Sequence, residues 1–148
     1  MTLYFDVFNN ELLSYCISPY RGGHNFKGHM IALKKFLLEK TKRGYTGVET
    51  ILHSDQGPVY TSRAFLNAHK NYNIKRSMSR AGTPTDNPII EALNGWIKDE
   101  LYKDFGLYQS NDIYKTIEDF FYYFNNERLA YSKKYKTPVE YRIQLGFS

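Results

Sequence analysis

Short apolar runs and longer periodic segments alternate along the chain. Four runs of apolar and aromatic residues have the length of strands, and two adjacent asparagines between the first two are typical of a hairpin turn. The predicted strands are residues 2–8, 11–18, 48–53 and 73–78. Between and after them, apolar residues recur three or four positions apart, which is the spacing of a helix with one buried face.

Four helices are predicted from this spacing, over residues 26–42, 62–70, 88–103 and 110–128. The third begins at Pro88, whose missing N–H costs nothing at a first helical position, and Asp86 or Asn87 can cap it. The residues expected to be buried are Phe26, Met30, Leu33 and Leu37 in the first helix, Ile90, Leu93, Ile97 and Leu101 in the third, and Ile113, Ile117, Phe120, Phe121 and Phe124 in the last. The tail, residues 132–147, is basic and predicted to be partly irregular.

The order of these elements indicates an α/β fold. Strands come first, strands and helices then alternate, and helices close the chain, which is typical of a mixed sheet flanked by helices. With 148 residues and no linker, the chain is expected to form a single domain, with a helical C-terminal extension at about residues 110–148. In such sheets, functional groups gather beyond the carboxyl ends of the strands.

Composition narrows the class of protein. Hydrophobic residues make up 42% of the chain and aromatic residues 17%, enough to form a core, and the single cysteine excludes an internal disulfide. No apolar run approaches the roughly 18 residues of a membrane span. A soluble, cytoplasmic protein with no membrane partner is therefore expected.

The net charge is +5, and the basic residues are grouped. Such groups suit a polyanion such as nucleic acid, although an ordinary lysine-rich surface would have the same composition. The three groups are Lys27, Lys34, Lys35, Lys40, Lys42 and Arg43; Lys75, Arg76 and Arg80; and Arg128, Lys133, Lys134 and Lys136.

Two carboxylates stand at the ends of predicted elements. Asp55 comes where the third strand ends, in the segment HSDQG, and a simple turn is one interpretation because Asp and Gly both form turns. Glu91 lies in the first turn of the helix that begins at Pro88, where the helix dipole favours a carboxylate. A solvated helix face is the alternative there. At spacings of four, three and four, one polar face of this helix collects Asn87, Glu91, Asn94 and Lys98.

A strand-end Asp and a helix-start Glu are the residue types that a divalent-metal site for phosphoryl transfer requires. Mg²⁺ prefers carboxylate oxygens and keeps waters and substrate phosphates as its other ligands. Two such ions can stabilise the entering and leaving oxygens of an in-line displacement. Because one Asp and one Glu are few ligands for two ions, a third carboxylate is expected. Lys98, on the same helix, could hold DNA phosphates nearby.

Two long segments carry a resemblance to a known family. HSDQGPVYTS, followed by SMSRAGTPTDNPIIEALNGWIKDEL, resembles the second half of insertion-sequence transposases with a retroviral-integrase-type (DDE) core. In that family, the second catalytic Asp stands in an H-S-D-x-G segment, and the final Glu follows an S-x-x-G-x-x-x-D-N loop. The family's spacing of 35 residues separates Asp55 from Glu91, and Lys98 matches its basic residue after the Glu. FNNERLAYSKKYKTPVEYR resembles the closing motif, and the match runs in order along nearly the whole chain.

The resemblance implies a fold, a chemistry and a set of roles. The fold would be the ribonuclease-H-like integrase core, a mixed sheet flanked by helices. Mg²⁺ or Mn²⁺ would activate water or a 3′-hydroxyl against a DNA phosphodiester, with Asp55 and Glu91 as the catalytic metal ligands. His53 and Gln56 would be neighbours of the site or parts of the strand and turn. The residues expected to contact transposon-end or target DNA are Lys98, Asn87, Lys34, Lys35 and Arg128, of which Arg128 could instead tie the last helix to the core.

One part of the family's pattern is missing. Its first catalytic Asp lies on a strand before the one that residues 3–18 resemble, so the chain is expected to be N-terminally truncated, with the first strand absent. Asp6 is expected to serve the hairpin rather than a metal. Such a chain would bind metal weakly, be catalytically defective, and associate with itself or with full-length transposase through its exposed sheet edge. The alternative is a non-catalytic DNA-binding or dimerising remnant that modulates full-length transposase.

Overall fold

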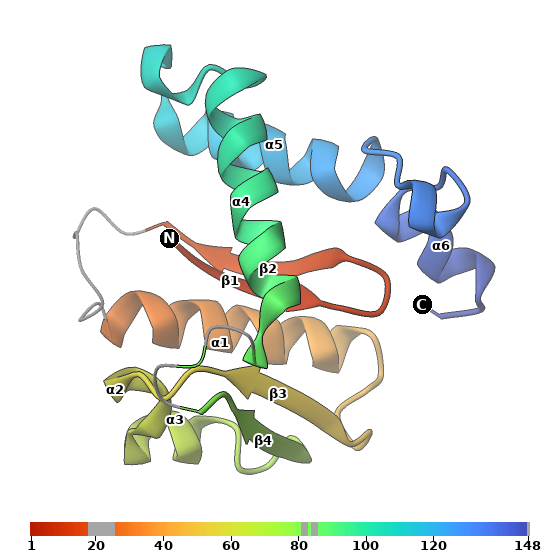
Figure 1. Ribbon diagram of the computed structural model, residues 1–148. Helices are drawn as coiled ribbons and strands as arrows, with labels where there is room; N and C mark the ends of the chain where they lie inside the picture. Colours follow the sequence, from red (N-terminus) through yellow and green to blue (C-terminus); the bar gives the residue numbers. More distant parts are fainter. Residues whose placement is uncertain (18–25, 81–82, 84–85, 148) are drawn as a thin grey trace. The chain divides into compact units, whose positions relative to one another are not determined.

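The computed structural model describes residues 1–17, 26–80, 83 and 86–147 (Figure 1). The chain divides into two compact units. Strands β1 (Thr2–Asp6) and β2 (Glu11–Cys16) pair with each other, and both units draw residues from this hairpin. The first unit comprises Met1–Tyr4 and Leu13–Asn87, and the second comprises Phe5–Leu12 and Pro88–Ser148.

In the first unit, the long helix α1 (Phe26–Lys42) is followed by two parallel strands. β3 (Thr50–Ser54) pairs with β4 (Ile74–Met78), residue by residue from one end to the other. Parallel neighbours cannot be joined by a tight turn, and two short helices, α2 (Pro58–Thr61) and α3 (Arg63–Ala68), form the crossover. The predicted helices and strands of this region are confirmed, and α2 is an additional turn of helix that the spacing did not predict.

The core of the first unit combines one face of α1 with side chains from the hairpin and the crossover. Tyr4 stacks on Phe36 with 5.1 Å between the ring centroids. Phe26, which was predicted to be buried, is exposed. It is the first residue of α1, where the side chain points back beyond the packed part of the helix. The buried residues of this core are Tyr4, Cys16, Ala32, Leu33, Phe36, Leu37, Val59 and Phe65.

His69, at the end of α3, is buried and makes the stability of the first unit depend on pH. Burial lowers the pKa of His69 below its ordinary value, and the nearby Arg76 cation lowers this pKa further. The unfolded chain therefore binds a proton that the folded chain does not, so stability is lost as the pH falls below about 6.5. We expect a lower Tm at about pH 5.5 than at about pH 7.5, and a smaller difference in His69→Gln. An unchanged difference in the variant would contradict this assignment.

The second unit contains two longer helices with buried apolar faces, α4 (Pro88–Lys103) and α5 (Ile113–Asn126). The short 3-10 helix η2 (Leu107–Gln109) lies between them in the chain. Ile113 is exposed although the pattern predicted it to be buried, because it is the first residue of α5 and points beyond the packed face. Ile90, also predicted to be buried, is half-buried. The rest of the two predicted stripes is confirmed by the buried residues Leu93, Ile97, Leu101, Ile117, Phe120, Phe121 and Phe124.

The C-terminal segment is more regular than predicted. A 3-10 turn, η3 (Tyr131–Lys133), is followed by the helix α6 (Pro138–Gln144). α6 begins with a capping box, in which Thr137 Oγ1 accepts from the Glu140 backbone N–H and the Glu140 carboxylate accepts from that of Thr137. The sequence T-P-V-E carries both the capping-box spacing and a proline at the first helical position. This helix could therefore have been predicted.

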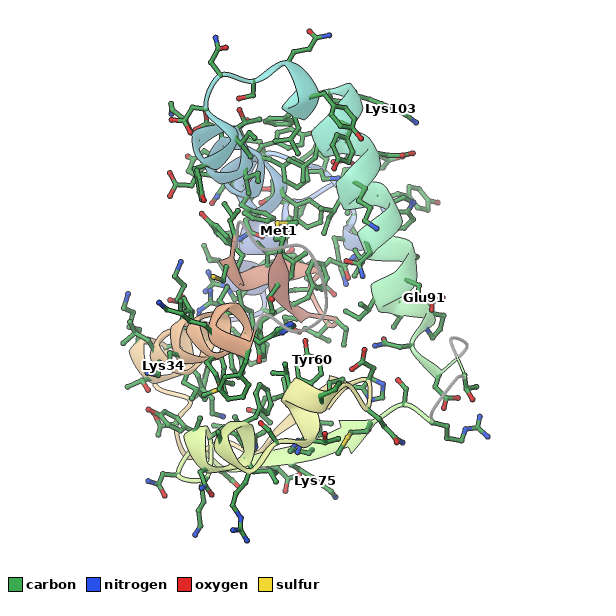
Figure 2. All side chains as sticks on the ribbon, turned by 90° about the vertical axis from the view of Figure 1, so that its left-hand side faces the viewer. Met1, Lys34, Tyr60, Lys75, Glu91 and Lys103 are labelled. Atoms are coloured by element: carbon green, nitrogen blue, oxygen red, sulfur yellow. The ribbon has the colours of Figure 1, made fainter. Side chains whose placement is uncertain are left out.

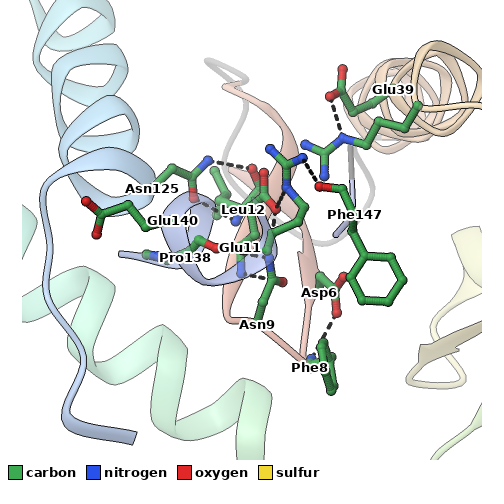
Figure 3. A network of polar contacts seen from close by, with 12 residues as sticks. Asp6, Phe8, Asn9, Glu11, Leu12, Glu39, Asn125, Pro138, Glu140 and Phe147 are labelled. Atoms are coloured by element: carbon green, nitrogen blue, oxygen red, sulfur yellow. Dashed lines mark hydrogen bonds and ion pairs between the residues drawn. The ribbon is translucent and has the colours of Figure 1, made fainter. Parts of the chain in front are cut away.

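A buried polar network ties the hairpin turn to the C-terminal helices within the second unit (Figure 3). Glu11 is only 2% exposed, and its carboxylate accepts hydrogen bonds from Arg142 Nε at 2.9 Å and Asn9 Nδ2 at 2.8 Å. The Asn125 side chain donates to the Leu12 carbonyl and accepts from the Leu12 N–H, both at 2.9 Å. Asn125 and Arg142 belong to the closing segment FNNERLAYSKKYKTPVEYR, so one role of that segment is to hold the hairpin.

Asp6 has the role in the hairpin turn that was expected for it. Its Oδ1 accepts a hydrogen bond from the Phe8 N–H at 2.9 Å. In the described part of the chain, no helix combines the length and the apolar character that crossing a membrane would require. The assignment of residues 1–148 to a single domain with a C-terminal extension stays a prediction.

Candidate active site

Asp55 directly follows β3 and is exposed. Its Oδ1 accepts from the Gly57 N–H at 2.8 Å, which closes a turn of the kind that Asp favours. A Cβ at position 57 would lie 2.8 Å from that oxygen, so glycine allows the turn to form. Oδ2 accepts no hydrogen bond from the residues that the structure describes. The two interpretations of Asp55 are therefore compatible, because one oxygen holds the turn and the other is open.

His53 and Gln56 fasten this strand end to β4 and the residue after it. The two ring nitrogens of His53 lie 2.9 Å from Ser77 Oγ and 3.0 Å from Ser79 Oγ. Gln56 Nε2 donates to the Ser79 carbonyl at 3.1 Å. Since both side chains are occupied by these contacts, they position the segment that carries Asp55, as the strand-packing interpretation expects.

Tyr60 and His29 form a polar pair beside Asp55 that the sequence analysis did not single out. Tyr60 Oη lies 3.0 Å from His29 Nδ1, and Thr2 Oγ1 lies 3.3 Å from the same nitrogen. Burial, with a smaller effect of the Asp55 charge, raises the pKa of Tyr60 to about 12. Burial also lowers the pKa of His29, and the positive charge of the Met1 ammonium lowers it further. The negative charge of Asp55 raises this pKa and so opposes both effects. A neutral phenol and a neutral imidazole thus border the Asp55 carboxylate near neutral pH.

The polar face of α4 lies beside its buried stripe. Glu91 projects from the first turn of the helix (Figure 2), where the partial positive charge of the helix start favours a carboxylate. Asn94 and Lys98 are exposed on the same face. Asn87 is half-buried and directly precedes the helix at Pro88. The arrangement leaves Glu91 and Lys98 accessible to a ligand.

Asp86, one of the two predicted caps of α4, is paired with Arg80 instead. The two carboxylate oxygens accept from the Arg80 backbone N–H and Nε at 2.9 Å and from its terminal nitrogen at 2.8 Å. These hydrogen bonds hold the pKa of Asp86 below its ordinary value. They connect the end of the segment after β4 to the residues just before α4. Arg80 therefore has an internal partner, which the grouping of basic residues did not reveal.

The basic residues of α1 differ in their availability. Lys34 and Lys35 are exposed, and Lys35 Nζ lies 5.1 Å from the centre of the Tyr15 ring. Lys40 is buried, and its Nζ donates at 2.6 Å to the Val48 carbonyl and to Thr50 Oγ1. Burial lowers the pKa of Lys40. Lys34 and Lys35 can therefore meet a polyanion, whereas Lys40 joins α1 to the start of β3.

Arg128 is held by an ion pair and by aromatic rings of the second unit. Its Nε and one terminal nitrogen donate to the Glu100 carboxylate at 2.6–2.9 Å. Its guanidinium carbon lies 5.1 Å from the centre of the Phe124 ring and 6.0 Å from that of Trp96. A planar, bidentate pair of this kind connects the end of α5 to α4. The structure thus contains the tie that was one of the two interpretations of this residue.

Asp55 belongs to the first unit and Glu91 to the second. Throughout the residues that the structure describes, no group of three or more His, Cys, Asp and Glu side chains could hold a metal ion. The functional roles that stay predictions are those of Asp55, Glu91, Asn87, Lys98, Lys34, Lys35 and Arg128.

Comparison with known proteins assigns the family. Residues 72–138 match the family model of the integrase core domain. The chain is 32% identical over 139 residues to the InsK protein of insertion sequence element IS150 of Escherichia coli K12, assigned as a transposase. The chain contains part of an integrase core domain and is related to insertion-sequence transposases. A transposase-like protein of Haemophilus influenzae is also 32% identical over 139 residues. Each alignment covers 94% of this chain, which spans 47% of the first relative and 61% of the second.

Solved structures of the integrase superfamily share the fold. A chain of the simian T-cell lymphotropic virus intasome superposes with a TM-score of 0.70 at 18% identity, covering 92% of this chain and 45% of that one. The catalytic core domain of HTLV-2 integrase, solved in complex with magnesium, superposes with a TM-score of 0.64 at 19% identity. That match covers 93% of this chain and 80% of the viral one. The predicted α/β, ribonuclease-H-like integrase core is therefore confirmed. The described strands, however, form two separate two-stranded sheets, β1–β2 and β3–β4, instead of the single mixed sheet that was predicted.

Proposed function

We propose that this chain is the catalytic-core part of a DDE-type transposase, which cuts and joins DNA phosphodiesters with the help of Mg²⁺ or Mn²⁺. The observation that carries the proposal is the pair of exposed carboxylates, Asp55 after β3 and Glu91 in the first turn of α4. They are separated by 35 residues in a chain of the integrase-core superfamily. In the transposase family that the sequence resembles, these two positions hold the second catalytic Asp and the final catalytic Glu.

The two carboxylates fit a hard divalent cation. Both are exposed, and Asp55 keeps one oxygen without a hydrogen bond from the described residues. Mg²⁺ takes few protein carboxylates and fills its other positions with water and phosphate oxygens. When bound, the metal would act as a Lewis acid on the phosphate and on the attacking water or 3′-hydroxyl. The chain's own part is to hold the carboxylates, through the Gly57 turn at Asp55 and through the helix start at Glu91.

The exposed basic and polar side chains would hold the DNA. Lys98 lies on the face of α4 that carries Glu91, and Lys34 and Lys35 lie on α1. Their ammonium groups suit phosphate oxygens, and such contacts make binding strongly dependent on salt. Asn87 would shape the approach to α4. Arg128 would contact DNA only through the part of its guanidinium that does not pair with Glu100.

We also propose that the metal is weakly bound by this chain alone and that DNA joining requires a further carboxylate. Two carboxylates neutralise too little charge for a site with two divalent ions. Association of the chain with itself or with a full-length transposase is one source of such a ligand. A chain that bound DNA but had no metal dependence would instead be the non-catalytic remnant that the sequence left open.

The metal proposal is tested by titrating the purified chain with Mn²⁺ and measuring free Mn²⁺ by electron paramagnetic resonance. Asp55→Asn and Glu91→Gln should each weaken binding about tenfold, because each removes one of few anionic ligands. Glu118→Gln, an equal change of charge at another exposed position, should leave binding unchanged. Equal affinities for all four proteins would contradict the assignment of Asp55 and Glu91.

The same proteins can be assayed for joining of a labelled transposon end to target DNA. The chain alone should give no product with Mn²⁺. Joining that disappeared in Asp55→Asn and Glu91→Gln would support the transposase role but overturn the proposed need for a further carboxylate. The metal titration therefore tests whether Asp55 and Glu91 are ligands. The joining assay tests whether the site needs a further carboxylate.

A further inference from the structure

Two tyrosines form a stacked, exposed pair at the C-terminal end of α4. Tyr102, in the last turn of the helix, stacks on Tyr108 of η2, with ring centroids 4.4 Å apart and planes inclined by 20°. Tyr102 is 40% exposed and Tyr108 is 83% exposed. Since Tyr108 is so exposed while one of its faces meets Tyr102, its other face is open. The pair therefore presents a flat aromatic surface backed by a second ring.

Tyr102 lies on the helix face that carries the candidate site. Glu91, Lys98 and Tyr102 are spaced seven and four residues apart, which places them in one row along α4. The eleven residues from Glu91 to Tyr102 correspond to about 16 Å along the helix axis. Nucleotides stacked as in B-form DNA advance by about 3.4 Å each, so this is a distance of about five nucleotides. The tyrosine pair thus continues the proposed DNA-binding face away from Glu91.

Charged residues also lie near the tyrosine pair. Lys103 pairs with Asp99 at 3.0 Å, Asp104 follows directly after the helix, and exposed Lys98 lies one turn before Tyr102. A second exposed pair, Tyr131 and Tyr135, meets edge to face, with planes inclined by 83°. Only Tyr102 and Tyr108 among these four rings combine parallel stacking with a place beside Lys98. What such a surface can bind is another flat aromatic ring.

We propose that Tyr108, supported by Tyr102, is a stacking site for an unpaired base of the DNA that lies on α4. This inference rests on the proposed function, because the DNA must first be held near Glu91 and Lys98. A base within a duplex already has neighbours on both of its faces. A base in a single-stranded or opened segment has a free face, and stacking on an aromatic side chain binds it with little dependence on sequence.

The test compares a blunt duplex with the same duplex carrying a single-stranded overhang, using fluorescence anisotropy and the purified chain. The overhang should tighten binding about tenfold, within the range that stacking of one base supplies. Tyr108→Ala should abolish this gain, and Tyr108→Phe should keep it because the ring remains. Tyr131→Ala, which removes an equally exposed ring elsewhere, should also keep it. Abasic nucleotides placed along the overhang should remove the gain at one position only.

The outcomes distinguish this inference from the proposed function. If Lys98→Ala weakens binding of both duplexes while Tyr108→Ala retains the overhang gain, the DNA-binding face stands and the stacking site is rejected. Loss of the gain in Tyr108→Phe as well as in Tyr108→Ala would also reject it, because the effect would then depend on the hydroxyl. If neither duplex binds the chain at any salt concentration, both the proposed function and the stacking site are overturned.

Discussion

Replacing Arg142 with alanine should lower the free energy of unfolding by about 3 kcal/mol. Glu11 is almost completely buried, and Arg142 Nε donates to its carboxylate at 2.9 Å as a cationic partner. Without the guanidinium, the buried carboxylate keeps the hydrogen bond from the Asn9 amide but loses this close positive charge. The expected cost is that of removing one partner from a buried ion pair, and it should be measured by urea unfolding of the chain.

An exposed ion pair supplies the control for this prediction. Lys103 and Asp99 lie 3.0 Å apart, with side chains 71% and 68% exposed, so Lys103→Ala should cost about 0.5 kcal/mol or less. Glu11→Gln combined with Arg142→Ala should be less destabilising than the sum of the two single changes, because the pair is removed together. Equal losses for Arg142→Ala and Lys103→Ala would show that the buried network does not hold the hairpin.

Phe65→Ala should lower the free energy of unfolding by about 4 kcal/mol. The ring is fully buried in the first unit, and Tyr60 and His69 meet it edge to face at 5.3 and 5.4 Å. Truncation removes the apolar surface and leaves a cavity that these two rings can fill only by moving. Because Tyr60 also contacts His29 beside Asp55, the change should disturb the surroundings of the candidate ligand.

The neighbouring residue gives the matched comparison for the core. Leu66 lies in the same short helix but is 41% exposed, so Leu66→Ala should cost less than about 1 kcal/mol. Denaturant unfolding of the two variants measures the difference directly. A loss at Phe65 no larger than that at Leu66 would mean that the crossover contributes little to the core of the first unit.

The spacing of residues along the chain was sufficient to predict the main helices and strands and the positions of Asp55 and Glu91 within them. The apolar periods of α1 and α4, with Pro88 at the start of α4, fixed bounds that agree with the structure. The same reasoning placed Asp55 after β3 and Glu91 in the first turn of α4. Each of these features depends on residues within a few positions of one another, so the sequence contains the relevant interactions.

Errors occurred where a local pattern ends. Phe26 and Ile113 follow the apolar period but are the first residues of their helices, so they extend beyond the surface that the helices bury. The helix α6 was missed because seven residues are too few to show a period, although its capping box was visible. The grouping of basic residues could not distinguish exposed Lys34 from buried Lys40, whose partners come from the segment after α1.

The sequence by itself indicated the relationship to transposases, the order of the longer elements and the two candidate metal ligands. Only the tertiary structure decided which polar side chains are used internally and which aromatic surface stays open. Glu11 and Arg142 are separated by 131 positions, and nothing near either residue indicates the other. Tyr102 and Tyr108 stack because the chain turns back after α4. Periodicity is a property of neighbours in the chain, whereas burial and ion pairing depend on where distant segments return.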